Sequence, residues 1–540
     1  MLYVDIETDS NGKLLLIGVK SDSKPIDIVD NWMDVLRYGF INGEDTWLAH
    51  NGGGFDYLHL LNYLIRENLL LDFSGIVVGS RIIAMDIVVK LKNSSKDNYK
   101  CRLIDSFNLW PVSLDAAARA LLNRSKIEIE VKPEKLSTSK LKEYLTNDII
   151  LLQDCYHEFN NQIEQLGYDG EPRITIASTS LAVFESMSGY KIRDVSDSVN
   201  DLIANSYSGG RVQLFQPGEH KFVKVYDINS MYPAVMLENQ YPYTGETTIK
   251  SRYNGEKCAF ISIHLHDIGD NKHSPIVRNG SEVFNGDLLV TSSEFAILED
   301  INASMKVHEC LVFNHTDRIF RDYIYRLYKI RISNSPLAFV AKLLMNSLYG
   351  KYGQSKIGTE LILGKHNDIT DCVPVSVESD IFAKETEREV RHRHVAIAAM
   401  VTAFGRVKLY RSMLETGFDH IIYCDTDSIH VNSDVAINTT SNLGDYKLEF
   451  TGSGIYLGKK LYQLYNSDTV KTVAKGIRHK ENKVYGGNAR LTTNDFRLLA
   501  TDENATMACE FAAMPTLREV LRGDTPCKPK IRIRKIRQVH

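Results

Sequence analysis

The chain has 540 residues, enough for two to four domains that each bury a core, and its 64 Lys and Arg against 68 Asp and Glu give a net charge of −4. The eight cysteines form no Cys-x-x-Cys pair, which argues against a zinc site and against a disulfide framework. No apolar run approaches about 18 residues, and the start leads directly into a strand-like segment with no room for a cleavable signal, so we expect a protein that is neither secreted nor inserted in a membrane.

The first predicted element is a strand at the amino terminus. Leu2–Thr8 alternates apolar and polar residues, which places Asp5 and Glu7 on one face. Such a pair alone would also fit an ordinary half-exposed strand, so a metal site is indicated only if further acidic residues accompany it.

Further acidic residues follow on two predicted helices. The segment Asn51–Asp56 enters one helix, and Tyr144 and Asp148 lie at i and i+4 on the face of another. Four carboxylates and a phenol can bind two metals, activate a water molecule and orient it on a phosphodiester. The amino-terminal third therefore carries a candidate hydrolytic metal site.

A third acidic element begins in the middle of the chain. Val225–Pro233 is predicted as an apolar strand that delivers Asp227 and turns into a helix near Pro233, because Pro suits a first helical turn. Asp227 would lie at the strand end, Ile228 would offer a backbone carbonyl, and Tyr232 would lie beside any bound metal.

Helical periodicity from about Leu337 places Lys342, Asn346 and Tyr349 at i, i+4 and i+7 on one face. A cation, an amide and an aromatic ring in this arrangement can grip a triphosphate, form hydrogen bonds and stack on a base. The plain alternative is an amphipathic helix whose Lys extends its stem along an apolar surface.

Two short predicted strands, Ile421–Tyr423 and Ile429–Val431, flank a tight acidic turn that contains Asp425 and Asp427. Two carboxylates at i and i+2 can project to one side and hold two hard cations about 3.5–4 Å apart, the geometry that clamps both oxygens of a phosphoryl displacement. The alternative is a solvated turn, since Asp, Thr and Ser are common turn residues.

The order of these elements resembles a known family. Asp227-x-x-Ser-x-Tyr-Pro, Lys342-x-x-x-Asn-Ser-x-Tyr-Gly and Tyr423-x-Asp-Thr-Asp are similar to three palm and fingers motifs of family B DNA polymerases, and the amino-terminal acidic set resembles DEDD-type 3′–5′ exonucleases in their tyrosine variant. The resemblance covers nearly the whole chain. It implies a multidomain fold of the α/β and α+β classes, in which a ribonuclease-H-like exonuclease domain precedes a right-hand polymerase with palm, fingers and thumb.

The resemblance implies two divalent metals in the exonuclease site. Their ligands would be the four carboxylates Asp5, Glu7, Asp56 and Asp148. Tyr144 would orient the attacking water, and Asn51 and Phe55 would bind DNA.

In the polymerase site the resemblance implies two Mg²⁺ or Mn²⁺ ions. Asp227 and Asp427 would bridge them with the Ile228 carbonyl, and Asp425 would be a nearby ligand or electrostatic support. Tyr232 would stack under the sugar and exclude a ribose 2′ hydroxyl. The residues expected to bind the nucleotide are Ile228, Tyr232, Lys342, Asn346 and Tyr349.

Smaller motifs resemble elements of protein-primed polymerases from small phages, adenoviruses and linear plasmids. Tyr207-Ser-Gly209-Gly210 is similar to the element that coordinates exonuclease and polymerase occupancy, although it also fits a glycine turn. Ser113-Leu114 is similar to a motif that holds primer ends or a priming protein, although it also fits a capped helix. The further residues expected to contact DNA are Tyr423, Lys460, Tyr462 and Lys475.

Spacing between the motifs suggests a division of the chain and two insertions. We expect an exonuclease domain at 1–170, a linker and first palm segment at 171–242, a terminal-protein-region-1-like insertion with palm at 243–317, fingers at 318–353, a terminal-protein-region-2-like insertion at 354–391, palm at 392–455, and palm end and thumb at 456–540. The second insertion should form a β-rich projection that pairs with the thumb, with strands at Glu360–Leu363 and Val373–Val377.

The net charge does not argue against DNA, because phosphate contact needs only local basic surface and metal sites concentrate acids. Basic clusters occur at Arg388–His394, Lys471–Lys480 and Lys528–Arg537, where alternating Ile residues predict a strand. The expected partners are template and primer DNA, dNTPs and a terminal (priming) protein. The expected state is a monomer, cytoplasmic in the host if phage-encoded and mitochondrial if carried by a linear organellar plasmid.

The function predicted is protein-primed replication of a linear viral or plasmid genome, with 3′–5′ proofreading and strand displacement. A conventionally primed or a primer-independent family B polymerase would carry the same metal motifs. A DNA-binding scaffold without catalysis would require both complete acidic sets to have no role.

Overall fold

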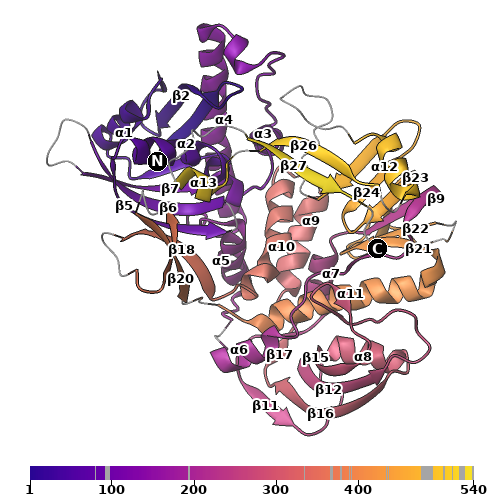
Figure 1. Cartoon of the computed structure of the whole chain (residues 1–540). Coiled ribbons are helices and arrows are strands. Elements are labelled where there is room, and N and C mark those ends of the chain that lie inside the picture. The colour runs from indigo at the N-terminus through magenta and orange to yellow at the C-terminus, as the bar shows by residue number, and fades with distance from the viewer. Residues whose placement is uncertain are drawn as a thin grey trace.

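The fold is that of a computed structural model, in which two large sheets and a smaller sheet are joined by helices (Figure 1). The structure describes residues 1–78, 81–91, 98–192, 195–333, 335–364, 369–376, 380–387, 390, 392–432, 435, 437–475, 491–502, 505–513, 515–521 and 530–537. No helix within these ranges is long and apolar enough to cross a membrane.

The amino-terminal part builds most of a ten-stranded mixed sheet. Its strands are β1 (Leu2–Thr8), β2 (Leu14–Ser21), β3 (Asp27–Val29), β4 (Thr46–Ala49), β5 (Leu70–Val78), β6 (Arg81–Lys90) and β7 (Asn98–Asp105), and its helices are α1 (Trp32–Ile41), α2 (Asp56–Arg66), α3 (Leu114–Leu122) and α4 (Thr138–Gln165). β1 pairs antiparallel with β2 and parallel with β4, which pairs parallel with β7. The mixed sheet with flanking helices expected for this part is confirmed.

Helix α4 lies directly against β1 and β2. Leu145 and Ile149 are fully buried one turn apart, and Gly18 of β2 leaves room for them, since a Cβ there would lie 3.0 Å from side-chain atoms of both. The close approach places Asp148, the residue before Ile149, beside β1.

The predicted second insertion, 354–391, extends this first sheet. β18 (Ile357–Leu363) pairs antiparallel with β5 and with β20 (Ile381–Glu387), which pairs with β19 (Cys372–Ser376). The β-rich character is confirmed, although Val377 lies outside the described residues and β20 was not expected. The insertion pairs through its backbone with β5, and helix α13 (Leu517–Leu521), in the part of the chain assigned to the palm end and thumb, packs on β19. The expected contact with the thumb region is therefore found, and enclosure of DNA stays a prediction.

A second large sheet has only antiparallel pairs, in the order β25-β24-β23-β9-β22-β21-β8. Its strands are β8 (Val212–Leu214), β9 (Gly218–Ile228), β21 (Ile421–Asp425), β22 (Ser428–Val431), β23 (Tyr446–Gly458), β24 (Leu461–Tyr465) and β25 (Val470–Ala474). Two helices, α7 (Met231–Glu238) and α11 (Val395–Thr416), pack on each other beside it. The antiparallel palm sheet implied by the resemblance is confirmed.

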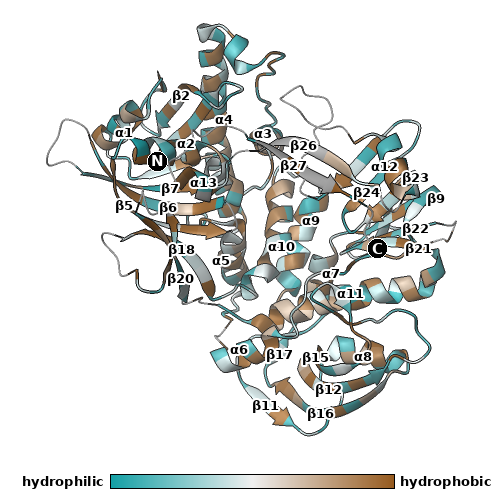
Figure 2. Ribbon diagram, in the orientation of Figure 1, coloured by the Kyte–Doolittle hydropathy of each residue, from teal (hydrophilic) through white to brown (hydrophobic). Residues whose placement is uncertain are grey.

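A group of helices connects the two sheets. They are α5 (Ile176–Ser188), α6 (Asp197–Ala204), α9 (Arg321–Ile332) and α10 (Ala338–Tyr352). Figure 2 shows apolar residues recurring along α10, where Val340, Leu344 and Leu348 form a fully buried stripe against α5 and α9. The opposite side of α10 leaves Lys342 and Asn346 exposed.

The predicted first insertion, 243–317, forms a separate four-stranded antiparallel sheet in the order β11-β16-β12-β15. Its elements are β11 (Thr247–Lys250), β12 (Ala259–Asp267), β15 (Gly286–Thr291), α8 (Ser292–Asp300) and β16 (Ser304–Phe313), with the short pairs β10 (Tyr241–Pro242) and β17 (Thr316–Asp317), and β13 (Val277–Arg278) and β14 (Ser281–Glu282).

A buried ionic network joins this smaller sheet to α11. Glu294 of α8 is fully buried and accepts hydrogen bonds from Arg278 at 2.9 Å and from Arg406 at 2.8 Å. Arg406 also donates to the carbonyls of Ser208 and, at 2.9 Å, Gly209. Burial would raise the pKa of Glu294, but the two guanidinium groups lower it to about 2. The network therefore fixes the glycine loop after Tyr207.

The carboxyl-terminal elements are α12 (Thr493–Thr501), β26 (Met507–Ala513), α13 (Leu517–Leu521) and β27 (Lys530–Ile536). β26 and β27 pair antiparallel, which confirms the strand predicted from the alternating Ile residues. Parts of the predicted basic clusters lie outside the described residues, namely Arg388, residues 476–480 and Lys528.

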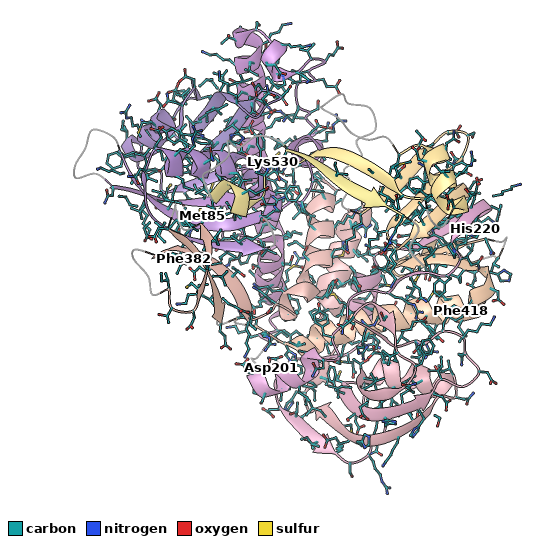
Figure 3. The ribbon with its side chains drawn as sticks, in the orientation of Figure 1. Met85, Asp201, His220, Phe382, Phe418 and Lys530 are labelled. Atoms are coloured by element: carbon teal, nitrogen blue, oxygen red, sulfur yellow. The ribbon has the colours of Figure 1, made fainter. Side chains whose placement is uncertain are left out.

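The β26–β27 hairpin bridges two hydrophobic cores (Figure 1). Its root, at Met507 and Ile536, packs with α12 and β23, and at the other end Leu517, Val520 and Leu521 of α13 are buried in the core of the first sheet, against α2. Lys530, at the start of β27, contacts Glu519 of α13 at 3.3 Å (Figure 3).

Val520→Ser should release α13 from α2, because a fully buried valine contributes about 1.5–3 kcal/mol by burial. Hydrogen exchange of the amides of residues 516–521 should accelerate while exchange in the first sheet stays unchanged. Val131→Ser is the matched control, since Val131 is 43 % exposed. Equal exchange of α13 in parent and Val520→Ser would show that the docking is not maintained by this contact.

Glu294→Gln should lower the free energy of unfolding by about 3–5 kcal/mol, because both arginines lose a buried counter-charge. A depressed carboxyl pKa contributes stability above the unfolded pKa of 4.5 that is lost as pH falls towards the folded value of about 2. The difference from the parent in thermal or denaturant unfolding should therefore be constant at neutral pH and shrink only in acid. Glu299→Gln, an exposed position on the same helix, should behave like the parent; an equally mild effect of both substitutions would contradict the expectation.

Candidate active sites

The first acidic cluster consists of Asp5 and Glu7 on β1 and Asp148 on α4. Their ligand atoms all lie within 4.8 Å of one another, and within the described part of the chain no other group of three or more His, Cys, Asp or Glu is gathered so closely. The alternation of β1 and the packing of α4 thus bring together three of the four predicted ligands.

The fourth predicted ligand, Asp56, lies beside this cluster but outside it. It is 2 % exposed at the first position of α2, and its Oδ1 accepts a hydrogen bond of 3.2 Å from the Ile6 amide, between Asp5 and Glu7 in β1. Burial, with the nearby charge of Asp105, raises the pKa of Asp56 to about 8.

The electrostatics of the cluster favour a bound cation. Burial, with Asp148 nearby, raises the pKa of Glu7 to about 7, and burial with the charges of Asp148 and Asp56 raises the pKa of Asp5. Asp148 Oδ1 is buried and accepts no hydrogen bond from any described residue. Oxygen ligands in this state fit a hard divalent metal, which would satisfy them and neutralise their repulsion.

Lys126 reaches into the same cluster and was not predicted. Its ammonium group forms an ion pair with Asp148 and lies 5.1 Å from the centre of the Tyr144 ring. Burial would lower the pKa of Lys126, but Asp148 and Asp5 raise it. Lys126 lies in an irregular segment between α3 and α4, where no periodic pattern marks it.

A second residue missed by the sequence analysis, Asp105, shapes the loop before Asp56. It accepts hydrogen bonds from the Asn51 amide at 2.8 Å and the Gly53 amide at 3.1 Å, and pairs with Arg81 at 2.7 Å. A Cβ on Gly53 would lie 2.0 Å from the Ile82 carbonyl oxygen, so only glycine fits there. This loop leads to Phe55, which is half-buried against His59.

Ser113 and Leu114, predicted to contact DNA, start helix α3. The Ser113 hydroxyl accepts a hydrogen bond from the Ala116 amide at 3.2 Å, as an N-cap does, and Leu114 is 6 % exposed. Ser113 therefore caps the helix, Leu114 has little surface left for a DNA contact, and the DNA contact of Ser113 stays a prediction.

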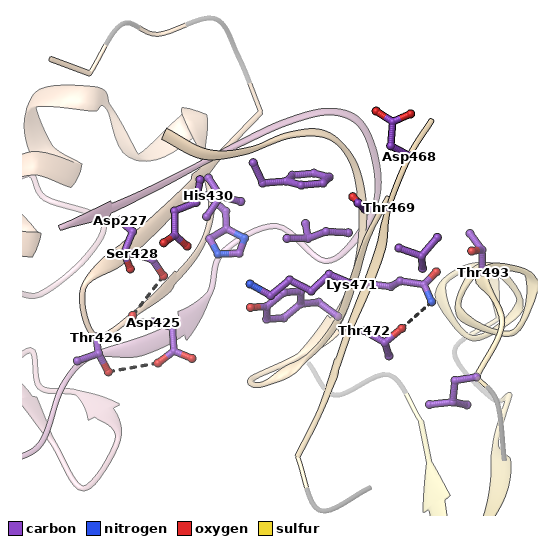
Figure 4. Close-up of a pocket in the computed structure, with 18 of the residues that line it drawn as sticks. Asp227, Asp425, Thr426, Ser428, His430, Asp468, Thr469, Lys471, Thr472 and Thr493 are labelled. Carbon is purple, nitrogen blue, oxygen red and sulfur yellow. Dashed lines mark hydrogen bonds between the residues drawn. The ribbon is translucent and has the colours of Figure 1, made fainter. Parts of the chain in front are cut away.

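The second acidic cluster lies on adjacent strands of the second sheet. Asp227, the last residue but one of β9, lies opposite Ser428 of β22, and the Ile228 amide donates to the Asp427 carbonyl at 2.8 Å. Thr426 adopts a left-handed conformation, and the Asp427 amide donates to the Asp425 carbonyl at 2.7 Å. The tight turn predicted from the sequence is confirmed, and it sets its carboxylates beside Asp227 (Figure 4).

The predicted glycine element packs directly on this turn. Thr426 donates its amide to the Arg211 carbonyl at 2.7 Å, and a Cβ on Gly210 would lie 2.6 Å from the Thr426 hydroxyl. Tyr207 packs against α10 at Gly353, where a Cβ would lie 2.8 Å from the Tyr207 ring. The loop thus links the carboxylate turn with α10.

The predicted nucleotide-binding residues meet between α7 and α10. The Tyr232 and Tyr349 rings lie 4.6 Å apart, and Gly405 of α11 makes room for Tyr232, since a Cβ there would lie 3.1 Å from its ring. Asn346 donates its side-chain amide to the Lys342 carbonyl at 2.8 Å. The structure therefore gathers Tyr349, Tyr232 and the carboxylates, with Lys342 further along α10.

The predicted primer-contact residues lie beside Asp425. Lys460 Nζ is 3.3 Å from Asp425 Oδ2, and the Lys460 amide donates to the Tyr423 hydroxyl, which itself donates to Asp425 at 3.3 Å. The Tyr462 ring lies 5.1 Å from that of Tyr423, and both are buried. Lys475 is exposed and donates its amide to the Lys460 carbonyl at 2.9 Å.

An open cavity of about 1560 Å³ begins at these carboxylates (Figure 4). Its lining includes Asp227, Asp425, Asp427, Glu449, Lys471 and Thr492. All three carboxylates of the second cluster therefore face one open cavity.

Burial and the charge of Asp227 raise the pKa of Asp427 to about 6, and burial also raises that of Asp227, against the effect of Lys447. Lys447, which was not predicted, lies 3.1 Å from Asp227 Oδ1. These carboxylates fit divalent metals for the same reason as the first cluster: a cation would offset the repulsion that raises their pKa values.

Comparison with other proteins agrees with this geometry. Residues 121–436 match the family described as DNA polymerase type B, organellar and viral. The DNA-directed DNA polymerase of Enterobacteria phage PRD1 is 27% identical over 477 residues, covering 83% of this chain and 79% of that protein, and the DNA polymerase of Streptococcus phage Cp-1 is 25% identical over 556 residues, covering 93% and 90%. A probable DNA polymerase of Ascobolus immersus is 24% identical over 548 residues, covering 85% of this chain, which spans 45% of that protein.

Phi29 DNA polymerase in complex with primer-template DNA, in a post-translocation binary complex, has the same fold, with a TM-score of 0.74, 20% sequence identity and 99% coverage of both chains. The fold of a right-hand polymerase with an amino-terminal exonuclease-like domain is thereby established. With more than half of its length matched by the family model, the chain belongs to the type B DNA polymerases of the organellar and viral group.

Proposed function

We propose that this family B DNA polymerase starts synthesis on a protein hydroxyl, proofreads with a 3′–5′ exonuclease and displaces the non-template strand while it replicates a linear viral or plasmid genome. It would act as a monomer, in the host cytoplasm if phage-encoded or in mitochondria if carried by an organellar plasmid. The observation that carries the proposal is the presence of two separate acidic clusters, on two sheets of one chain.

In the polymerase site, Asp227 and Asp427 would hold two Mg²⁺ or Mn²⁺ ions with the Ile228 carbonyl, and Asp425 would assist them. The bound metals would activate the primer hydroxyl and stabilise the leaving pyrophosphate. Lys342 is exposed on α10, and no ion-pair partner of it is found among the described side chains, so its charge is available to the triphosphate.

The Tyr232 and Tyr349 rings, which are inclined at 45° to each other, present aromatic surface on which a sugar and a base can stack. Because Gly405 and Met231 enclose Tyr232, its ring has little freedom to withdraw, which supports its proposed role in excluding a ribose 2′ hydroxyl. Asn346 offers its side-chain oxygen from the same helix face.

In the exonuclease site, Asp5, Glu7 and Asp148 would hold divalent metals, with Asp56 as a fourth ligand after a small shift from the Ile6 amide. The metals would supply a water-derived nucleophile. Tyr144, beside the ammonium of Lys126, is placed to orient that water, and the loop carrying Asn51 and Phe55 borders the cluster where a DNA end would enter.

The two predicted insertions support protein priming and strand displacement. The segment 243–317 forms a sheet of its own, and 354–391 extends the first sheet, so neither is needed to complete the palm or the fingers. Extra surfaces of this kind suit docking of a terminal protein and enclosure of DNA. A conventionally primed or primer-independent polymerase, or a non-catalytic DNA-binding scaffold, would leave one or both without a role.

Asp227→Ala and Asp427→Ala should each lower primer extension by at least about 100-fold and spare 3′–5′ degradation of single-stranded DNA, because the clusters lie on different sheets. Asp5→Ala combined with Asp148→Ala should do the reverse. Extension and degradation of a labelled primer in the presence of Mg²⁺ measure the polymerase and the exonuclease activity. Asp300→Ala on α8 is a control outside both clusters. Near-normal extension by Asp227→Ala would exclude the polymerase assignment, and near-normal degradation by the double variant would exclude the exonuclease assignment.

Incubated with the candidate priming proteins of its own genome, labelled dNTP and a terminal origin fragment, the enzyme should attach a nucleotide covalently to one of them. The label should survive denaturing gel electrophoresis, disappear after protease treatment and be absent with Asp427→Ala. Extension of an annealed primer without labelling of any protein would favour the conventionally primed alternative.

A further inference from the structure

We propose that Lys447 is a built-in counter-cation of the polymerase site, which competes with divalent metal for Asp227 until a nucleotide arrives. The proposal rests on the assignment of Asp227 as a metal ligand. It adds a residue that positions charge and sets the order in which metal and nucleotide bind.

The backbone places Lys447 in this position. Lys447 of β23 is the direct antiparallel partner of Asp227 on β9, and residues opposite each other in such a pair project to the same face. Its ammonium lies 3.1 Å from Asp227 Oδ1 and 2.8 Å from Glu449 Oε1. The contact therefore follows from strand register as well as from the choice of rotamer.

The local charge explains why the ammonium remains there without metal. Asp227, Asp425, Asp427 and Glu449 all line one cavity. Lys460 pairs with Asp425, whereas Lys447 bridges Asp227 and Glu449. Each lysine thus offsets repulsion that the fold imposes on the carboxylates.

A divalent ion changes this balance. Ion-to-oxygen distances are about 2.1 Å, so an ion on Asp227 Oδ1 would lie within about 5 Å of the ammonium and repel it. The Lys447 side chain is 47 % exposed and has a flexible four-carbon stem, so it can swing away. Once displaced, it loses its contact with Asp227, and another anionic group would stabilise it in its new position.

A triphosphate supplies the missing partner. Triphosphate oxygens that bind the same metal as Asp227 would lie beside this carboxylate, where the displaced ammonium can pair with them. Lys447 therefore opposes metal binding in the absence of nucleotide and favours the joint arrival of metal and dNTP. The consequence is positive coupling between the two ligands, which the Lys447 charge creates.

The test uses the full-length chain with Asp5→Ala and Asp148→Ala, so that the first cluster contributes no tight metal site. Free Mn²⁺ is measured by electron paramagnetic resonance, and the sites lost in Asp227→Ala define the polymerase class. Lys447→Met should tighten Mn²⁺ binding to that class by about tenfold without nucleotide and reduce the gain in Mn²⁺ affinity on adding dNTP. Lys447→Arg should resemble the parent in both measurements.

Lys250→Met is the matched control, because Lys250 is 41 % exposed and pairs with Glu256 at 2.7 Å in the smaller sheet. It should leave Mn²⁺ binding unchanged. Unchanged or weaker Mn²⁺ binding by Lys447→Met, while Asp227→Ala still removes a class of sites, overturns the role of Lys447 alone. If Asp227→Ala removes no class, both this inference and the proposed metal role of Asp227 are wrong.

Discussion

The mutual repulsion of carboxylates that the fold forces together is the constraint on which both acidic clusters depend. Burial and like charge raise the pKa of Glu7 to about 7 and that of Asp427 to about 6, so each cluster stores unfavourable charge. In each case an ammonium group offsets part of it, and the pairs are Lys126 with Asp148, Lys447 with Asp227, and Lys460 with Asp425. Binding of a divalent cation therefore stabilises such a site more than it would stabilise a site whose carboxylates do not repel one another.

The surrounding structure prevents the carboxylates from moving apart. Gly18 lets α4 lie close enough to bring Asp148 to β1, and Gly210 lets the loop after Tyr207 cover Thr426 in the carboxylate turn. Arg406, which is paired with Glu294, donates a hydrogen bond to a backbone carbonyl of that loop and so holds it in place. A continuous set of contacts therefore runs from α8 beside the smaller sheet to the carboxylate turn of the second sheet. The rigidity of the second cluster derives partly from a segment outside the palm.

Much of the fold and of the two sites could be predicted from the sequence, because the signals were local. Alternation set Asp5 and Glu7 on one face, and the Asp-Thr-Asp turn lay between two short apolar strands. The residues that were missed act over long sequence distances. Lys126 lies in an irregular loop. Asp105 accepts hydrogen bonds from backbone amides of a loop that precedes it by more than fifty residues.

The same limit explains what else the sequence left open. Lys447 is opposite Asp227 only because of strand register, which periodicity does not reveal. The pairing of 354–391 depends on β5 offering an unpaired edge, a property of the assembled sheet. Ser113 shows the reverse case, in which a local signal fitted two interpretations and the structure shows the N-cap.

The bridge made by the β26–β27 hairpin has a topological consequence. The first sheet is joined to the second through the helices around α10 and again through α13 docked on α2, so these contacts form a closed circuit, in which the buried side chains Leu517, Val520 and Leu521 hold α13 in place. Undocking of the five-residue helix α13 from α2 would therefore open this circuit while leaving the strand pairing of both large sheets intact.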